Sequence, residues 1–185
     1  MTSFKVITLG EFMIGKQVEI AIKAFSAFYH DLTSKHQKKC SLVLIDKEEF
    51  INPLKDFASK HEIDKAIEFL SWEEQEKIKA NYEDASVMFL PLRESTGRIL
   101  PEALSFSLPV LSYKCKEVSE YVDMTCSMLC DYNSDEQNIL AFAEMLRLIY
   151  FDPEARKILS KGALKKYETS FSWGKHKGRA VAKTA

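Results

Sequence analysis

Two glutamates, Glu94 and Glu102, are the residues whose type and spacing best suit chemistry. They stand with seven residues between them in the segment LPLRESTGRILPEALSFSLPVLSY, residues 90–113. A carboxylate binds hydroxyl groups by accepting hydrogen bonds, and such charge-assisted bonds contribute roughly 1.5 to 3 kcal/mol each. Between the glutamates, Gly97 allows close backbone approach, and the N-terminus of a following helix offers free N–H groups to an anion. A ligand that carries phosphate with hydroxyls at both ends, such as a sugar derivative, suits this arrangement.

The elements that must position these residues are short apolar runs that alternate with amphipathic stretches. The first run is FKVITLG, and the helix after it has apolar positions at helical spacing: Val18, Ile22, Phe25, Tyr29 and Leu32. Further strands are predicted at residues 41–46, 66–70, 86–92, 109–113 and 126–131, and further helices at 48–62, 73–85, 99–107, 134–150 and 154–171. Because the strands are nearly all apolar, they should be buried on both faces of a parallel sheet with right-handed crossovers. The predicted class is α/β, a Rossmann-like doubly wound parallel sheet of about six strands with flanking helices.

The predicted topology places the glutamate pair at the carboxyl edge of the sheet. In an open sheet of this kind, ligands bind outside the carboxyl ends of the strands. Glu94 would then lie in the loop after the fourth strand and Glu102 on the helix that follows, both facing one crevice. A glutamate pair at this spacing without such a context is mostly a pair of solvated surface carboxylates. The preceding strand, Gly97 and the following LPV favour a binding site instead.

The same segment resembles a known signature. PLRESTGRILPEALSFSLPVLSY is similar to the signature of retaining family 4 glycosyltransferases of the GT-B fold, in which Glu, seven residues and Glu bind the nucleotide-sugar donor. The matching positions are Glu94, Gly97, Arg98, Glu102, Ala103, Pro109, Val110 and, less tightly, Glu120. Weaker similarity extends from residue 4 to about residue 173. This span corresponds to the C-terminal half of such an enzyme.

The resemblance implies roles for individual residues. Glu94 would be the catalytic residue and would bind hydroxyls of the donor sugar, while Glu102 would bind the ribose. Backbone N–H groups in the segment between the two glutamates would hold the sugar and the diphosphate. The implied donor-binding residues of that segment are Ser95, Thr96, Gly97, Arg98 and Ile99.

Two more strand-end loops contribute to the expected site. In GEFMIGK, Gly10 and Lys16 match the family spacing, and Lys16 would face the diphosphate, but Glu11 stands where the family carries Arg. At about 4 Å, reversing the sign of one charge changes an interaction of roughly 1 kcal/mol in water and about 4 at a partly buried site. Arg98 could compensate for that change. The nucleotide base would meet the loop after the third strand, where Ser71 offers backbone groups.

No metal and no cofactor are expected. The sequence has no Asp-x-Asp pair, and in the GT-B resemblance a lysine and the helix dipole would neutralise the leaving diphosphate. Cys126 and Cys130 flank a strand and favour core packing over a metal site, because no histidine pair is nearby. The four histidines lie in helix-like or tail segments, so none is expected to act in catalysis.

Length and composition limit the number of domains, the partners and the location of the protein. The 185 residues, 46% of them hydrophobic, suit a single core, predicted as a nucleotide-sugar-binding domain over residues 1–173 with a flexible basic tail over 174–185. A net charge of -1 gives no basic field for nucleic acid. Four cysteines and the absence of a long apolar run indicate a soluble protein of the reducing cytoplasm. Peripheral contact of the basic tail with the inner face of a membrane is the alternative placement.

The expected function is that of the donor-binding half of a glycosyltransferase in polysaccharide biosynthesis. It would move a hexose-type sugar from a nucleotide-diphosphate sugar to a glycan or lipid-linked acceptor, with retention and without metal. The acceptor-binding N-terminal domain is not in this chain, so the domain alone should be nearly inactive. A piece of a longer enzyme, a natural half with a partner chain and a domain that has lost chemistry all stay open. The alternative is a noncatalytic nucleotide or nucleotide-sugar binding module, which Glu11 and the pair Lys116-Glu117, in place of a family Gly-Gly, favour.

Overall fold

The computed structural model describes residues 3–10, 17–93 and 99–171. Strands and helices alternate along the chain, except that two helices follow one another after the first strand and again after the last. The strands are β1 (Phe4–Leu9), β2 (Cys40–Asp46), β3 (Ile67–Ser71), β4 (Val87–Phe89), β5 (Val110–Tyr113) and β6 (Ser127–Cys130). The helices are α1 (Gln17–His30), α2 (Ser34–Gln37), α3 (Glu48–Lys60), α4 (Gln75–Asp84), α5 (Ile99–Ser105), α6 (Lys116–Ser119), α7 (Asp135–Phe151) and α8 (Pro153–Ser170).

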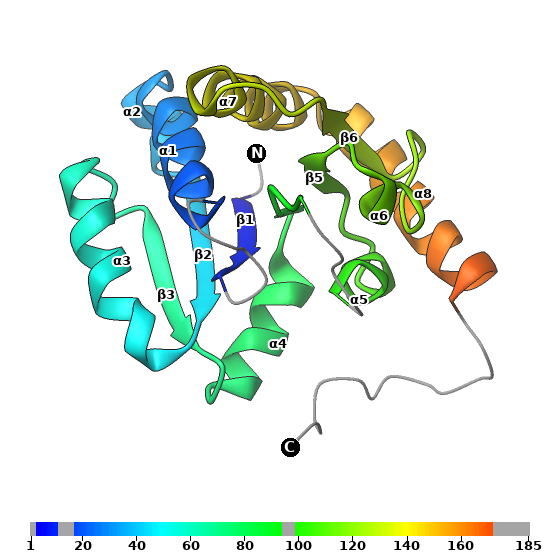
Figure 1. The fold of residues 1–185 in the computed structure, drawn as a ribbon, viewed down its shortest axis with the longest axis horizontal. Coiled ribbons are helices and arrows are strands. Elements are labelled where there is room, and N and C mark those ends of the chain that lie inside the picture. The colour runs from blue at the N-terminus through cyan, green and yellow to red at the C-terminus, as the bar shows by residue number, and fades with distance from the viewer. Residues whose placement is uncertain (1–2, 11–16, 94–98, 172–185) are drawn as a thin grey trace.

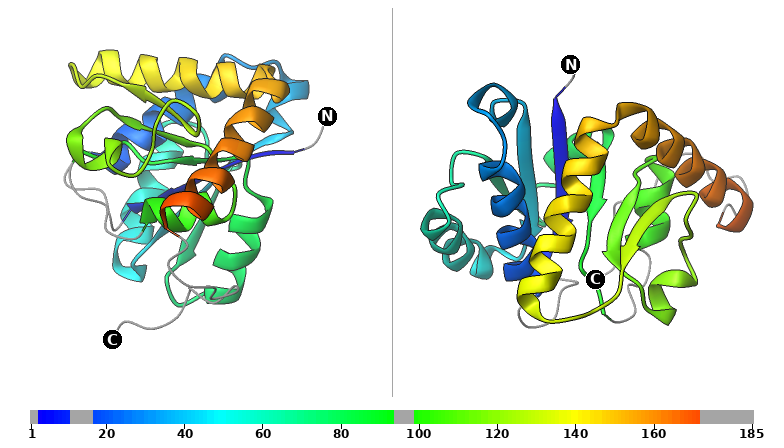
Figure 2. Two further views of the ribbon diagram at one scale, coloured as in Figure 1. Left: turned by 90° about the vertical axis from the view of Figure 1, so that its right-hand side faces the viewer. Right: turned by 90° about the horizontal axis from the view of Figure 1, so that it is seen from above.

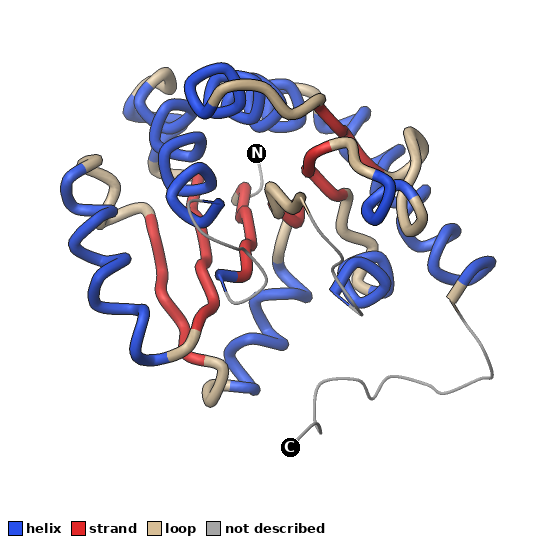
Figure 3. Tube along the Cα trace, in the orientation of Figure 1, coloured by secondary structure: helices blue, strands red, loops and turns tan. Residues whose placement is uncertain are grey.

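The strands form one parallel sheet in the order β3-β2-β1-β4-β5-β6 (Figures 1 and 3). The predicted α/β, Rossmann-like, doubly wound architecture of six strands is therefore confirmed. The strand order reverses between β1 and β4. Pairing across this seam is short, because it comprises only Val6 with Val87 and Ile7 with Met88, whereas β1 and β2 are paired along the whole of β1.

Helices cover both faces of the sheet. Helices α1 and α7 pack side by side across one face, and α4 and α5 lie on the other (Figures 1 and 2). Helix α8 runs from the end of α7 to the side of α5, which it contacts. Strand side chains are buried against both layers, since Val6, Ile7 and Leu9 are all inaccessible to solvent. Burial on both faces explains why the strands read as continuous apolar runs.

The last two helices begin at side-chain caps. The Ser134 hydroxyl accepts a hydrogen bond from the Gln137 N–H at the start of α7. At the start of α8, the Asp152 carboxylate accepts one from the Ala155 N–H, and Pro153 occupies the first helical position. A proline suits this position because the N–H it lacks would have no partner within the helix. The pair Asp152-Pro153 thus ends one helix and begins the next.

Helix α5 ends in a turn that places Ser107 in the left-handed region, with φ 60°. The Leu108 N–H donates to the Ala103 carbonyl at 3.1 Å, and the Ser107 N–H donates to the Leu104 carbonyl at 2.9 Å. These two bonds close the helix in the manner of a Schellman motif, in which glycine is the usual left-handed residue. A serine there costs roughly 1 kcal/mol because its Cβ crowds the backbone.

Helix α8 packs closely on the connection between β5 and β6. A Cβ added to Gly162 would lie 1.8 Å from the carbonyl oxygen of Thr125, so only glycine fits. One turn later, the Lys166 ammonium forms an ion pair with Asp123 at 2.8 Å. Asp123 also accepts hydrogen bonds from the Thr125 hydroxyl and N–H. Together these contacts join α8 to the sheet edge.

Some details differ from the sequence predictions. Helix α2 was not predicted, because four polar residues carry no apolar periodicity. Strand β4 is shorter than the predicted 86–92, since the chain leaves the sheet after Phe89. Cys126 is buried as predicted, and Cys130 is half-buried. None of the described helices has the length and apolar composition needed to cross a lipid bilayer. The predicted tail, residues 174–185, lies outside the described residues.

Candidate functional site

The carboxyl edge of the sheet carries the candidate site. Strands β1 and β4 are neighbours there, and the chain leaves them toward opposite halves of the sheet. A crevice outside such a reversal point is the usual ligand site of open α/β sheets. Gly10 follows β1 directly, and residues 90–93 follow β4. The loop with Glu94 and the helix with Glu102 therefore start at the expected position.

Gly10 packs against a buried carboxylate. A Cβ added to Gly10 would lie 1.9 Å from Oδ2 of Asp46, the last residue of β2. Asp46 is only 4% exposed, and its Oδ1 accepts a hydrogen bond from the Lys47 N–H at 2.7 Å. A side chain at position 10 would therefore displace the Asp46 carboxylate. Asp46 was not singled out from the sequence, although a carboxylate directly after the apolar run SLVLI was the available signal.

Ser71 lies beside Asp46 on the neighbouring strand, where the two residues are paired in register. Its N–H donates to the Glu74 carboxylate at 3.0 Å, and its carbonyl accepts from the Glu74 N–H at 2.9 Å. Its hydroxyl accepts from the Glu73 N–H at 3.4 Å. The backbone groups expected to meet a nucleotide base are therefore engaged in the local turn before α4.

Glu102 lies in the first turn of α5 and is half-buried. Burial raises the pKa of this carboxyl to about 7. No ion pair or side-chain hydrogen bond of Glu102 occurs among the described residues. Its charge also contributes to the raised pKa of the buried Tyr82, where burial is the larger cause. A half-buried carboxylate without a cation can accept hydrogen bonds from a ligand, and such perturbed groups are common in functional sites.

The chain between β4 and α5 is held at both described ends. The Leu92 N–H lies 3.4 Å from the hydroxyl of buried Ser112 on β5. The Arg93 guanidinium lies over the ring of Tyr132, a residue of the loop after β6, with its Cζ 3.9 Å from the ring centre. On the far side, Ile99 is the first residue of α5 and is buried in the core, so only its backbone could meet a ligand. These contacts fix where the loop of residues 94–98 begins and ends.

Two residues of this edge escaped the sequence analysis. Exposed Arg93 places a cation next to the predicted catalytic position. At the end of β5, buried Tyr113 packs against Tyr132 and Phe142, and its hydroxyl has no hydrogen-bond partner among the described residues. Burial, more than neighbouring charge, raises the pKa of Tyr113. Sequence spacing does not reveal these residues, because Arg93 follows β4 and Tyr113 ends β5, and each packs against Tyr132, which follows β6.

The structure thus brings Gly10, Ser71, Ile99 and Glu102 to one edge of the sheet. The other predicted site residues lie outside the described residues: Lys16, Glu94, Ser95, Thr96, Gly97 and Arg98, together with Glu11. Within the described part of the chain, no group of three histidine, cysteine or carboxylate side chains is arranged to hold a metal ion.

Comparison with known families identifies the chain. The family model described as glycosyl transferases group 1 matches residues 1–166. This match covers most of the chain, and the strand order described above belongs to the region that it spans. No match is found among curated protein sequences.

Solved structures share the fold. The C-terminal domain of LpcC, a glycosyl transferase group 1 family protein from Francisella tularensis, superposes with a TM-score of 0.71 at 16% identity, covering 92% of this chain and 88% of that one. WaaG, a glycosyltransferase involved in lipopolysaccharide biosynthesis, gives a TM-score of 0.73 at 20% identity over 92% of this chain. The pneumococcal O-GlcNAc transferase GtfA, in complex with UDP and GlcNAc, gives 0.73 at 17% identity over 90% of this chain.

The covered lengths show which part of those proteins the fold represents. The chain spans 44% of the WaaG chain and 32% of the GtfA chain, but nearly the whole of the LpcC C-terminal domain. The family match and this fold together identify the chain as a member of the glycosyl transferases group 1 family, family 4, with the fold of a GT-B C-terminal domain.

Proposed function

We propose that this domain binds the nucleotide-sugar donor of a retaining, metal-independent glycosyltransferase. The complete enzyme would move a hexose-type sugar from a nucleoside-diphosphate sugar to a glycan or lipid-linked acceptor in polysaccharide biosynthesis. An acceptor-binding domain, on the same polypeptide or on a partner chain, would close the crevice over the carboxyl edge. The domain alone would bind donor but transfer sugar poorly. GtfA, a relative by fold, is described in complex with UDP and GlcNAc.

The observation that carries this proposal is the environment of Glu102. Its carboxylate is half-buried, lacks a cation among the described residues and stands in the first turn of α5, directly after the reversal point of the sheet. Two ribose hydroxyls would supply the hydrogen-bond donors that the carboxylate lacks. Each such bond would favour the ionised form of Glu102, so nucleotide binding should lower its pKa.

The other residues near the reversal point would bind the remaining parts of the donor. Glu94 would bind the donor sugar and act in catalysis, and the backbone of residues 95–99 would hold the sugar and diphosphate. Gly10 would lie near the diphosphate at the end of β1, where Lys16 would contribute positive charge. Arg98 and exposed Arg93 are the cations available to offset Glu11. Ser71 could meet the base only if the turn that holds Glu74 rearranged, because Glu74 occupies its N–H.

A second candidate function is a binding module without transfer activity. After β5, where the family often has a Gly-Gly pair, this chain forms the short helix α6 with Lys116 and Glu117 at its start. Side chains at these positions limit how closely a phosphate can approach the backbone. Nucleotide binding without transfer, even with the acceptor domain present, would favour this alternative.

Thermal unfolding against UDP, GDP, ADP and their sugar conjugates tests the proposal. At a nucleotide concentration near 100 times Kd, linkage stabilises the protein by about 2.7 kcal/mol, which should raise the midpoint by roughly 5 to 11 °C in a domain of this size. Glu102→Gln should lose the shift from the nucleotide. Glu94→Ala should lose only the additional shift from the sugar.

The control is Glu136→Gln, which changes an exposed glutamate in the first turn of another helix, α7. This variant should keep the full shift. A wild-type domain that no nucleotide stabilises, or a Glu102→Gln variant that responds like wild type, would contradict the assignment of donor binding to this edge.

A further inference from the structure

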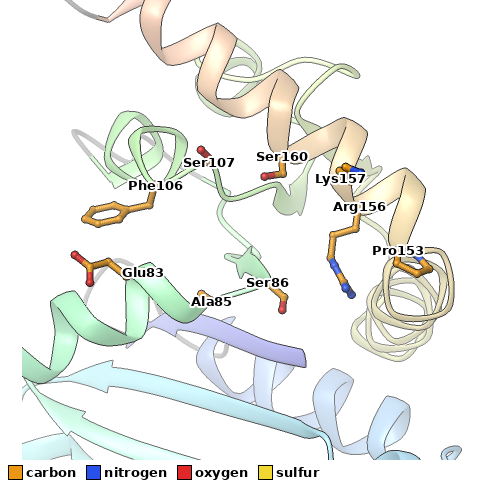
Figure 4. Close-up of a pocket in the computed structure, with 9 residues that line it drawn as sticks. All are labelled: Glu83, Ala85, Ser86, Phe106, Ser107, Pro153, Arg156, Lys157 and Ser160. Atoms are coloured by element: carbon orange, nitrogen blue, oxygen red, sulfur yellow. The ribbon is translucent and has the colours of Figure 1, made fainter. Parts of the chain in front are cut away.

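A polar cavity lies far from the carboxyl edge. It has a volume of about 350 Å³ and lies between α8 and the chain segments that enter β4 and β5 (Figure 4). Ser86 immediately precedes β4, and Ser107 lies shortly before β5. The cavity is therefore at the amino edge of the sheet, opposite to the edge that carries Gly10 and Glu102.

Positive charge and hydroxyl groups dominate its lining. Arg156 and Lys157 come from the first turns of α8, and Ser86, Ser107 and Ser160 come from three separate parts of the chain. Figure 4 shows the Arg156 side chain extending from α8 toward Ser86. The one carboxylate of the lining, Glu83, is exposed and lies 3.8 Å from the Lys79 ammonium.

The two cations have few partners. Arg156 donates one hydrogen bond, to the Ile149 carbonyl at 3.3 Å, and its guanidinium lies 5.4 Å from the centre of the Phe4 ring. Neither Arg156 nor Lys157 forms an ion pair within the described part of the chain. Burial lowers the pKa of Arg156. A partly buried guanidinium with free N–H groups favours a planar or tetrahedral anion, which can accept several of its hydrogen bonds.

The hydroxyls are free to donate to the same ligand. The Ser86 hydroxyl oxygen accepts from the Lys5 N–H at 3.3 Å, which leaves its own proton available. For Ser107 and Ser160, no side-chain hydrogen bond occurs among the described residues. Ser107 also holds a left-handed backbone conformation that glycine would adopt without strain.

We propose that this cavity binds a small phosphomonoester. Arg156, Lys157 and the serine hydroxyls would hold the phosphoryl group. The cavity is larger than a phosphate ion, and its other end is formed by the Phe106 ring and Glu83, which suit the body of a hydroxylated ligand. Carboxylates accept hydrogen bonds from hydroxyls, and an aromatic face packs against their carbon skeleton. The site is separate from the proposed donor site.

The test titrates the chain with glycerol phosphate, inorganic phosphate and, as a neutral control, glycerol, and follows backbone amide chemical shifts. Saturable shifts are expected at Ser86, Ser107 and Ser160 with glycerol phosphate, but not with glycerol. Lys157→Ala should weaken binding about tenfold, since it removes a charge-assisted contact. The matched control Lys161→Ala changes an exposed lysine of α8 outside the cavity and should leave binding unchanged.

Ser107→Gly separates binding from stability. It should weaken binding because it removes a hydroxyl, and raise the unfolding midpoint because it relieves the backbone strain. Ser107→Asn, which tolerates the left-handed region and keeps a donor, should retain more of the affinity. Absence of saturable binding, shifts confined to Gly10 and the first turn of α5, or equal weakening by Lys157→Ala and Lys161→Ala would overturn the proposal. Binding of inorganic phosphate as tight as that of glycerol phosphate would overturn the role of Phe106 and Glu83.

Discussion

At the carboxyl edge of the sheet, the Asp46 carboxylate fills the place that a side chain of residue 10 would take, because a Cβ on Gly10 would lie 1.9 Å from it. Gly10→Ala should therefore lower the free energy of unfolding by about 2 kcal/mol through overpacking. In an Asp46→Ala background, the same change should cost much less, and chemical denaturation of the four variants measures this coupling. Equal costs in both backgrounds would show that the contact is not the reason for the glycine.

Glu102 should make the domain less stable as the pH rises. Its pKa is about 7 in the folded protein against an ordinary value of 4.5, so the folded state binds the proton more tightly than the unfolded state does. Stability should fall as the pH increases from about 4.5 to 7, by roughly 1 to 2 kcal/mol because solvent screens a half-buried group. Glu102→Gln should match wild type at pH 4 and exceed its stability at pH 8 in urea unfolding. If wild type were more stable than Glu102→Gln at pH 8, the ionised carboxylate would not be destabilising, which would contradict the raised pKa of Glu102.

The left-handed Ser107 offers a stabilising substitution. Ser107→Gly keeps the hydrogen bonds that close α5 and removes the crowding of the Cβ, so the free energy of unfolding should rise by roughly 1 kcal/mol. Ser105→Gly, at the last residue of α5, is the contrasting control and should destabilise by roughly 0.5 kcal/mol. Thermal unfolding of the two variants gives the comparison. A lower unfolding midpoint for Ser107→Gly than for wild type would show that the left-handed conformation of Ser107 is not strained.

Gly162 should tolerate no side chain. The atom nearest to an added Cβ is the backbone carbonyl oxygen of Thr125, which cannot rotate away, so α8 would have to shift. Gly162→Ala should destabilise by about 3 kcal/mol despite the higher helix propensity of alanine. Lys161→Ala, at the adjacent exposed position, should change stability by less than about 0.5 kcal/mol. A stabilised Gly162→Ala variant would show that α8 does not pack this closely on Thr125.

The ion pair of Asp123 and Lys166 should stabilise the domain above pH 4. Hydrogen bonds from Lys166 and Thr125 lower the pKa of Asp123 to about 2, from an ordinary 3.8. The contribution is thus present above about pH 3.8 and is lost as the pH falls toward 2. Because Asp123 is 45% exposed, solvent screening limits it to about 1 kcal/mol. Asp123→Asn should lower stability by that amount at pH 7 and by little near pH 2, as measured by urea unfolding.

Apolar periodicity predicted the architecture well, because the four central strands, β2, β1, β4 and β5, are buried on both faces and their sequences are correspondingly apolar. The edge strands β3 and β6 are only partly buried. The run SLVLID, for example, lies wholly within β2, which begins one residue earlier at Cys40. The exceptions have local causes. Helix α2 is too short and polar to produce a pattern, and the turn before α4 engages Ser71 through Glu74, which spacing cannot reveal.

The candidate site was predictable in its outline but not in its details. The position of Glu102 after β4 follows from the strand order and the Glu, seven residues, Glu spacing. Whether Glu102 has an ion-pair partner, however, depends on which side chains reach the start of α5, and sequence spacing does not show this. The contact of Gly10 with Asp46 joins residues 36 positions apart, and the amino-edge cavity joins Ser86, Ser107 and Ser160. Only the folded chain brings these groups together.

The short seam between β1 and β4 has a consequence for hydrogen exchange. The two halves of the sheet meet there through only two residue pairs, Val6 with Val87 and Ile7 with Met88. A ligand that touched both Gly10 and Glu102 would bridge the halves directly above this seam. Amide protons of β1 and β4, which no ligand touches, should then exchange more slowly in the bound domain. This short pairing would become a reporter of occupancy at the carboxyl edge.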